Sequence, residues 1–170
     1  TSPSHAYLYA NGSAEDLNRG IFSAVAYDVN DLGQVVGRGW PNQIGQAFLF
    51  DNNGVNQNLG TLVTNGQSQA NAINNNGQVV GWASSSSNAR VAFLYENGSM
   101  LDLCVLVDCT AKGWDFFEEA TGINDNGDIV GYGSIGGVTR GFVISAVPVP
   151  AAAWLFLSGL FGLLGFIRRR

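Results

Sequence analysis

The strongest constraint on the fold is a motif of twelve residues that occurs three times in the chain. Each copy begins with Ala, has Asn at its fifth position and Gly at its eighth, and ends with two β-branched residues and a further Gly. Periods of a few tens of residues are typical of repeat architectures, in which each unit is one supersecondary element. The copies span residues 26–37, 70–81 and 120–131, so that Asn30, Asn74 and Asn124 lie 44 and 50 residues apart.

A second motif of small and aromatic residues alternates with the first. In residues 47–50 (Ala-Phe-Leu-Phe) the two Phe point to one face of a strand, and Ala and Leu point to the other. Because both faces are apolar, we expect such a strand to be buried between stacked sheets. The motif lies at residues 6–9, 47–50, 92–95 and 141–144, and the first three copies lead through Gly12, Gly54 and Gly98 to Leu17, Leu59 and Leu103.

The Asn and Gly of the first motif predict a tight turn that joins two short strands into a hairpin, because both residues tolerate the left-handed backbone conformation. The sequence therefore predicts an all-β fold of antiparallel repeats of about 45 residues, similar to propeller blades. A β-prism or a β-trefoil is the closed alternative. We expect a β-repeat ectodomain at residues 1–145, with repeats at approximately 6–46, 47–91 and 92–140 and a closing strand at 141–145.

The chain has four aromatic strands of this kind but only three Asn-Gly hairpins. Three units are also few for a propeller that closes on itself. We therefore expect an incomplete ring or an open stack whose exposed strand edges invite another chain, including a second copy.

These segments resemble the HAF repeat of bacterial extracellular proteins. The Ala-x-x-Ile-Asn-x-x-Gly-x-Val-Val-Gly core and the His5-Ala6-Tyr7-Leu8 start carry the resemblance, which covers most of residues 5–144. Only the first copy has His, because Gln46, Val91 and Arg140 stand at that place in the others. The resemblance implies a fold type and an extracellular location, and it implies no reaction.

The last residues of the chain form a separate, three-part segment. The uncharged run 151–167 would reach about 25 Å as a helix, which is close to the thickness of a bilayer's hydrocarbon core. Pro148 and Pro150 place the start of this helix near Ala151. The basic residues 168–170 (Arg168, Arg169 and Arg170) predict, by the positive-inside rule, that the ectodomain lies outside the cytoplasm.

This segment resembles the PEP-CTERM sorting tail, in the variant whose motif reads Val-Pro-Leu-Pro-Ala. The motif here, within the linker 146–150 and the next residue, is Val147-Pro148-Val149-Pro150-Ala151, so that Val149 stands where the variant has Leu. In that family an exosortase, a membrane-embedded cysteine-dependent transpeptidase, removes the tail and passes the ectodomain to the cell surface or matrix. The resemblance implies an exosortase as a transient partner, a membrane-anchored precursor, and a Gram-negative bacterium that makes exopolysaccharide.

The composition fits an exported domain of strands and turns. Charged residues make up only 12% of the chain, which is too few for the polar faces of long amphipathic helices. Without the three terminal arginines, five basic residues face thirteen acidic ones, a net charge of −8 that opposes nucleic-acid binding. Residues 1–4 are polar and show no signal peptide, so we expect a removed leader or a truncated chain.

Cys104 and Cys109 are the only cysteines. An export context permits disulfides, so we expect a bridge that closes a small loop. Two free thiols are the alternative. A pair of Cys without further Cys or nearby His does not make a zinc site.

No set of residues predicts catalysis, a metal or a cofactor. His5 is the only histidine and has no nucleophile elbow to join. Glu118 and Glu119, with Asp115 nearby, form an acidic cluster that a glycosidase could use, but adjacent residues of a strand point to opposite faces. Turns such as the one from Asp28 to Gly33 are faintly similar to calcium loops but lack their carboxylate count. We predict that the protein is not an enzyme.

Trp40, Trp82 and Tyr132 follow the glycines that end the three motifs. Aromatic rings that recur in this way predict either packing between repeats or stacking on the apolar faces of sugar rings. The sequence thus predicts an exported surface or matrix protein with a structural or adhesive role that can assemble with itself. The alternatives are a carbohydrate-binding module for exopolysaccharide and, third, a hydrolase that acts on glycans.

Overall fold

The computed structural model describes residues 3–10, 12–41, 43–51, 55–87 and 89–145. As predicted, the fold is all-β, and its thirteen described strands form four antiparallel sheets. The strands are β1 (Tyr7–Ala10), β2 (Ser13–Asp16), β3 (Ala24–Val29), β4 (Val35–Gly39), β5 (Gln46–Phe50), β6 (Asn56–Gly60), β7 (Ser68–Ile73), β8 (Val79–Ser84), β9 (Arg90–Glu96), β10 (Ser99–Asp102), β11 (Phe116–Ile123), β12 (Ile129–Ile135) and β13 (Val138–Ile144).

Two of the sheets have four strands each and the same plan. Their orders are β3-β4-β5-β6 and β10-β9-β8-β7, so that each is a simple meander of neighbouring strands. The registers also agree, because Val36 lies opposite Leu49 in the first sheet as Val80 lies opposite Leu94 in the second. The three-stranded sheet β11-β12-β13 repeats the first three strands of this plan, and a separate two-stranded hairpin consists of β1 and β2.

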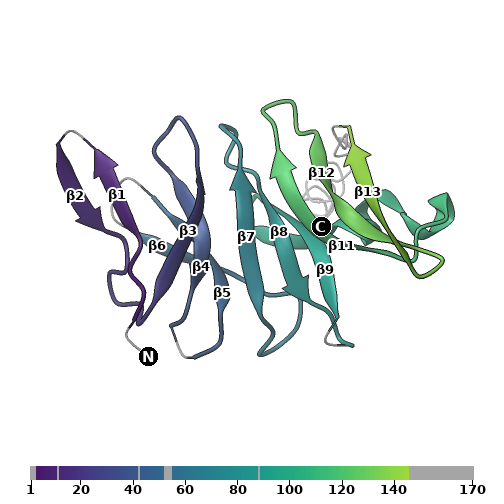
Figure 1. Ribbon diagram of the computed structural model, residues 1–170, viewed down its shortest axis with the longest axis horizontal. Helices are drawn as coiled ribbons and strands as arrows, with labels where there is room; N and C mark the ends of the chain where they lie inside the picture. Colours follow the sequence, from purple (N-terminus) through teal and green to yellow (C-terminus); the bar gives the residue numbers. More distant parts are fainter. Residues whose placement is uncertain (1–2, 11, 42, 52–54, 88, 146–170) are drawn as a thin grey trace, which may run out of the picture.

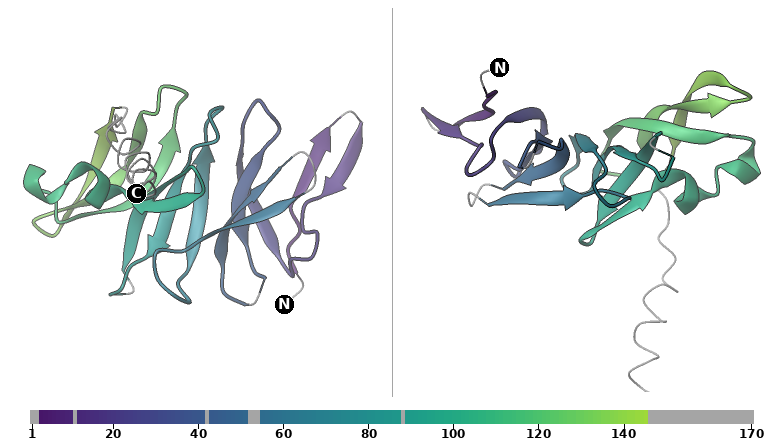
Figure 2. Two further views of the ribbon diagram at one scale, coloured as in Figure 1. Left: turned by 180° about the vertical axis from the view of Figure 1, so that it is seen from behind. Right: turned by 90° about the horizontal axis from the view of Figure 1, so that it is seen from below.

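The sheets follow one another in chain order along the long axis of the molecule (Figure 1). The view from below shows the hairpin at one end of this row and the three-stranded sheet at the other (Figure 2). The boundaries of the sequence repeats do not coincide with those of the sheets, and the two are offset by two strands. The repeat expected at 47–91, for example, contains the last two strands of one sheet and the first two of the next.

A separate apolar core fills each of the three spaces between neighbouring sheets. Phe48 and Phe50 face the hairpin, whereas Ala47 and Leu49 on the same strand face the second four-stranded sheet. This arrangement confirms that the strand is buried on both faces. Complete burial of a side chain such as Phe50 stabilises the fold by about 2–3 kcal/mol.

The predicted turns join β3 to β4, β7 to β8 and β11 to β12. In the second of these, the amide of Gly77 donates to the carbonyl oxygen of Asn74 at 3.1 Å, and Gly77 has a φ of +78°. The last Gly of the motif is required for a different reason, which is the close approach of a neighbouring strand. A Cβ atom on Gly81 would lie 1.9 Å from the carbonyl oxygen of Gln69, beside a bulge that β7 makes between Ala70 and Ala72.

One short helix, α1 (Leu103–Val107), and a 3₁₀ turn, η1 (Thr110–Lys112), connect the second four-stranded sheet to β11. The carboxylate of Asp102 caps α1 by accepting the amides of Cys104 and Val105 at 2.8 and 3.2 Å. A disulfide joins Cys104 to Cys109, which confirms the predicted bridge. Cys109 is completely buried between the second four-stranded sheet and the three-stranded sheet, so the bridge lies inside that core.

None of the helices in the described ranges is long and apolar enough to cross a membrane. The predicted spanning helix 151–167, the basic end 168–170 and the sorting motif 147–151 lie outside the residues that the structure describes.

Candidate functional site

A ladder of asparagine side chains connects the turns of successive sheets. Asn30 Nδ2 donates to the carbonyl oxygen of Asn74 at 3.1 Å, and Asn74 Nδ2 donates to the carbonyl oxygen of Asn124 at 3.0 Å. Within its own turn, Asn74 Oδ1 accepts the amides of Asn76 and Gln78 at 3.1 and 2.9 Å. Each Asn therefore shapes one turn, and Asn30 and Asn74 also link their turns to the next sheet. We call these three residues the Asn ladder.

The residue after each ladder Asn adds a second row of contacts. Asn75 Nδ2 donates to carboxylate oxygens of both Asp31 and Asp125 at 2.9 Å. The side-chain oxygens in turn accept backbone amides, since the amide of Asp31 donates to Asn75 Oδ1 and that of Asn75 to Asp125 Oδ1. An uncharged residue in the middle thus separates two carboxylates. This order avoids direct repulsion between Asp31 and Asp125.

The aromatic residues singled out in the sequence lie among arginines. The Arg38 guanidinium lies 5.2 Å from the ring centres of both Trp40 and Trp82, and that of Arg90 lies 4.1 Å from Trp82. Guanidinium groups at such distances are attracted to the faces of indole rings. We call these four residues the Arg–Trp row.

The sequence prediction did not include the two arginines of this row. Arg38 occupies the position equivalent to Trp82 and Tyr132, so the only signal was an Arg where the other copies have an aromatic residue. Burial lowers the pKa of Arg38 from its ordinary value. Tyr27 opposes this lowering of the pKa, and the charge of Arg90 makes a smaller contribution in the same direction as burial. Arg38 Nη2 donates to Gln67, while its buried Nε has no hydrogen-bond partner among the described residues.

The row continues into the three-stranded sheet through Glu119. Arg90 Nη1 lies 3.7 Å from Glu119 Oε2, which also accepts the hydroxyl of Tyr132 at 2.8 Å. The hydrogen bond to Glu119, with burial and the charge of this carboxylate, raises the pKa of Tyr132 to about 12. Contacts of these polar and aromatic side chains therefore extend from the first four-stranded sheet to the three-stranded sheet.

The three predicted glycan contacts differ in their exposure. Trp82 is only 3% exposed and is covered by two guanidinium groups, so its ring faces are occupied. Trp40 and Tyr132 are half-buried. Of the two aromatic explanations, packing between repeats describes Trp82, whereas part of the Trp40 side chain is accessible to solvent. The contact with a glycan itself stays a prediction.

Asp28, Asp115 and Glu119, which were considered for catalysis or calcium, accept hydrogen bonds from other groups of the protein. Asp28 Oδ2 accepts the amide of Ile73 at 2.9 Å, which links β3 to β7. Asp115 accepts the amide of Gly137 at 3.0 Å and the hydroxyl of Ser134 at 2.7 Å, and these bonds lower the pKa of its carboxyl. His5 Nδ1 lies 2.7 Å from Asp16 Oδ2. Within the described ranges, no three His, Cys, Asp or Glu residues are grouped as a metal site requires.

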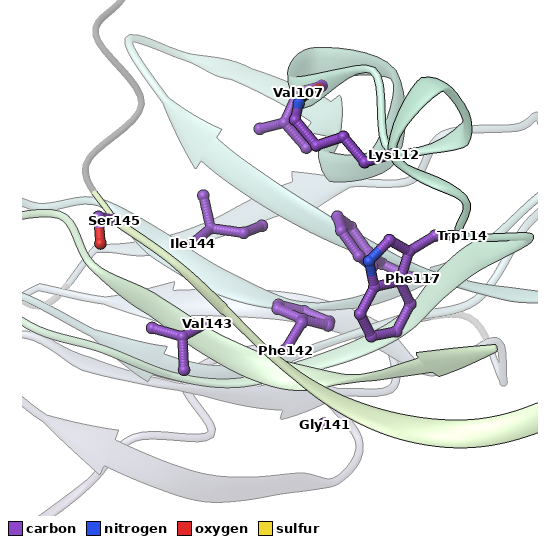
Figure 3. Close-up of a pocket in the computed structure, with 9 residues that line it drawn as sticks. All are labelled: Val107, Lys112, Trp114, Phe117, Gly141, Phe142, Val143, Ile144 and Ser145. Atoms are coloured by element: carbon purple, nitrogen blue, oxygen red, sulfur yellow. Dashed lines mark hydrogen bonds between the residues drawn. The ribbon is translucent and has the colours of Figure 1, made fainter. Parts of the chain in front are cut away.

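A cavity of about 550 Å³ lies beside the outer edge of β13. Figure 3 shows Trp114, Phe117 and Phe142 gathered on one side of it, with Val107 and Lys112 of the α1–η1 segment on another. The Phe117 and Phe142 rings are 4.2 Å apart between centres, and Trp114 meets both edge-on. The cavity is therefore an aromatic pocket next to a strand edge, and the sequence did not predict it.

The two ends of the row of sheets expose faces that are buried elsewhere. Val130 is 42% exposed, although its equivalents Val36 and Val80 are completely buried against the next sheet. Its cross-strand neighbour Val143 is 71% exposed. At the other end, Tyr9 of the hairpin is 80% exposed.

Comparison with known proteins places the chain in a family without assigning an activity. The family model described as "Protein of unknown function (DUF3466)" matches residues 4–140. Neither a curated protein nor a solved structure matches the chain. The matched residues include all four sheets apart from the last residues of β13. The chain therefore belongs to the DUF3466 family of proteins of unknown function.

Proposed function

We propose that this chain is an exported repeat protein of the cell surface or extracellular matrix, with a structural or adhesive role. In this proposal the sheets are successive blades of a propeller-like array that is open at both ends. The hairpin supplies the third and fourth strands of a first blade, and β11 to β13 supply the first three strands of a last blade. Contacts with further copies complete the array.

The observation that carries the proposal is the contrast between the middle and the ends of the row. The two middle sheets have four strands each and bury residues of both faces. The end sheets have fewer described strands, and residues such as Tyr9 and Val143 are exposed where equivalent residues are covered. Unpaired edges and apolar faces of this kind favour association with other chains.

The export part of the proposal depends on the tail and on the disulfide. The three-part order of motif 147–151, apolar run 151–167 and basic end 168–170 is that of a sorting tail handled by an exosortase. Disulfides such as Cys104–Cys109 persist in oxidising compartments outside the cytoplasm. In the proposal the chain is a membrane-anchored precursor until the tail is removed.

The test is to produce the chain, preceded by a cleavable export signal, in a Gram-negative host that has an exosortase and in the same host without it. We expect protein on the cell surface or in the medium, with an intact mass that places its C-terminus between Ala146 and Ala151. A variant with Pro148→Ala and Pro150→Ala is the matched control and should keep its tail. Protein that stays in the cytoplasm, or keeps Arg170 in the presence of the exosortase, would contradict the proposal.

A second candidate function is the binding of exopolysaccharide, favoured by the half-buried Trp40 beside the Arg38 guanidinium. An indole face next to a cation suits a sugar that carries a carboxylate. Trp40→Ala should then reduce retention on an acidic polysaccharide, while the equally aromatic Phe22→Ala, in an exposed loop, should not. Equal retention of both variants and the parent would remove this candidate.

A further inference from the structure

Among the strands that the structure describes, none pairs with the outer edge of β13, whereas the equivalent strands are paired on both edges. In the first four-stranded sheet, β5 lies between β4 and β6, and in the second, β9 lies between β8 and β10. Strand β13 has the same place in its sheet, but among the described strands it pairs with β12 alone. Its outer backbone amides and carbonyls are therefore available to a fourth strand.

The aromatic pocket lies where a side chain of such a strand would point. In the second four-stranded sheet, Met100 of β10 lies opposite Tyr95 and packs into the core on that face. The residue equivalent to Tyr95 in β13 is Ile144, which lines the pocket together with Phe142 and Trp114 (Figure 3). The pocket is thus an apolar space beside an open edge, with room for a large side chain.

The hairpin at the other end of the molecule offers a strand with matching features. Strand β1 pairs with β2 alone among the described strands, so its second edge is open. Tyr7 and Tyr9 lie on one face of β1 and are 51% and 80% exposed, whereas Ala6 on the opposite face is buried against the first four-stranded sheet. This segment presents two aromatic side chains and an unpaired backbone together.

We propose that a second copy of the chain adds its β1 edge to the β13 edge of the first, so that Tyr7 and Tyr9 enter the aromatic pocket. This inference deepens the proposed function, because it specifies the contact by which copies assemble. A ladder of main-chain hydrogen bonds supplies affinity, and the two tyrosines in an aromatic pocket supply specificity.

The same docking would also cover the exposed face of the three-stranded sheet. Side chains point to alternate faces along a strand. When Tyr9 lies on the same face of the joined sheet as Phe142, Leu8 therefore lies on the opposite face, together with Val143. In the second copy, Leu8 packs against its own first four-stranded sheet. That sheet would then cover Val143 and Val130 of the first copy, displaced by one strand from the position that each later sheet has over the one before it. Such head-to-tail contacts produce a ring or an open filament.

The test is disulfide trapping between two variants of the full chain, each with one added cysteine besides the Cys104–Cys109 disulfide, kept in a mild detergent. Tyr9→Cys in one copy is mixed with Phe142→Cys or Ile144→Cys in the other, because both of these side chains line the aromatic pocket. Val143→Cys is the matched control on the same strand, since it lies between the two test positions and its side chain points to the opposite face. Cysteines whose Cβ atoms point apart do not form a bridge, so we expect at least about a tenfold excess of cross-linked dimer over this control.

The result that would overturn the inference is the absence of a cross-link with both test positions, or one of equal yield with Val143→Cys. The trapping reports the β1–β13 contact itself, so association through the apolar tail cannot imitate it. Protein recovered from the cell surface without this cross-link would refute the interface and leave the proposed function standing. Cross-linked protein confined to the cytoplasm would refute the proposed function and leave the interface standing.

Discussion

The side-chain amide of Asn74 donates a hydrogen bond to the backbone carbonyl oxygen of Asn124 at 3.0 Å, from one sheet to the next. Asn30 makes the same bond to Asn74 one sheet earlier, at 3.1 Å. Apolar faces alone would allow neighbouring sheets to slide, whereas these bonds connect a specific turn to a specific turn. The Asn ladder therefore sets the relative position of successive sheets.

Asn74→Ala should lower the free energy of unfolding by about 2–3 kcal/mol, because the buried Asn74 side chain is lost and the turn amides and the carbonyl of Asn124 lose their partner. Asn124→Ala is the matched control, since Asn124 has the same turn bonds but is exposed and donates to no further sheet in the described part of the chain. We expect a loss of about 1 kcal/mol for this variant. Urea unfolding of both variants makes the measurement, and equal losses would contradict a role of the ladder between sheets.

Arg90→Met should lower the stability by about 1 kcal/mol, because it removes the cation from the face of Trp82 and the ion pair with Glu119. Methionine keeps most of the apolar part of the arginine side chain, so the loss of stability measures the contribution of the positive charge. Arg140→Met is the control, since Arg140 is exposed and no ion pair is described for it. Chemical denaturation should show almost no change for the control. A stability of Arg90→Met equal to the parent's would mean that the Arg–Trp row is not stabilising.

Tyr132 should titrate later than ordinary tyrosines, because its hydroxyl donates to the Glu119 carboxylate and this raises the pKa to about 12. The ultraviolet absorbance of tyrosinate should show a component near pH 12 that is absent from Tyr132→Phe. The folded-state pKa lies above the unfolded value of about 10, so the stabilisation is complete below about pH 10 and is lost as the pH rises toward 12. If both proteins lose stability equally over this window, the assignment is wrong.

Reduction of the Cys104–Cys109 disulfide should lower the free energy of unfolding by about 2 kcal/mol, since the bridge closes a short loop in the unfolded chain. The measurement is the urea midpoint with and without a thiol reductant. A variant with both cysteines changed to alanine should not respond to the reductant. Alkylation of the untreated, native protein at either cysteine would contradict the bridge.

The strands and turns were predictable from the sequence because their determinants are local. Alternation of apolar residues in 47–50 indicates burial on both faces, and the spacing of Asn74 to Gly77 indicates a turn. The same residues appear in three copies, which makes the pattern stronger than any single copy. Burial of Leu17, Leu59 and Leu103 follows from the same repeat.

The contacts between sheets were less predictable, because they join residues more than forty positions apart. Asn30, Asn74 and Asn124 were assigned to turns, although a turn does not require the same residue in all three copies. The presence of Asn at this position in all three copies was therefore the one sequence signal for contacts between the turns. For the Arg–Trp row, Arg38 breaks the repeat pattern, and nothing in one sequence indicates that Arg90 lies over Trp82. The aromatic pocket lies where the described part of the three-stranded sheet has no fourth strand. Only the order of the strands in the sheets reveals this position.

Hydrogen–deuterium exchange of the full chain at increasing protein concentration tests most directly whether the open ends complete one another. We predict that backbone amides of β1 (Tyr7–Ala10) and β13 (Val138–Ile144) become protected together as the concentration rises. Amides of the central strand β8 (Val79–Ser84) should be equally protected throughout. Exchange of β1 and β13 that is independent of concentration, in a protein that stays monomeric, would contradict the account.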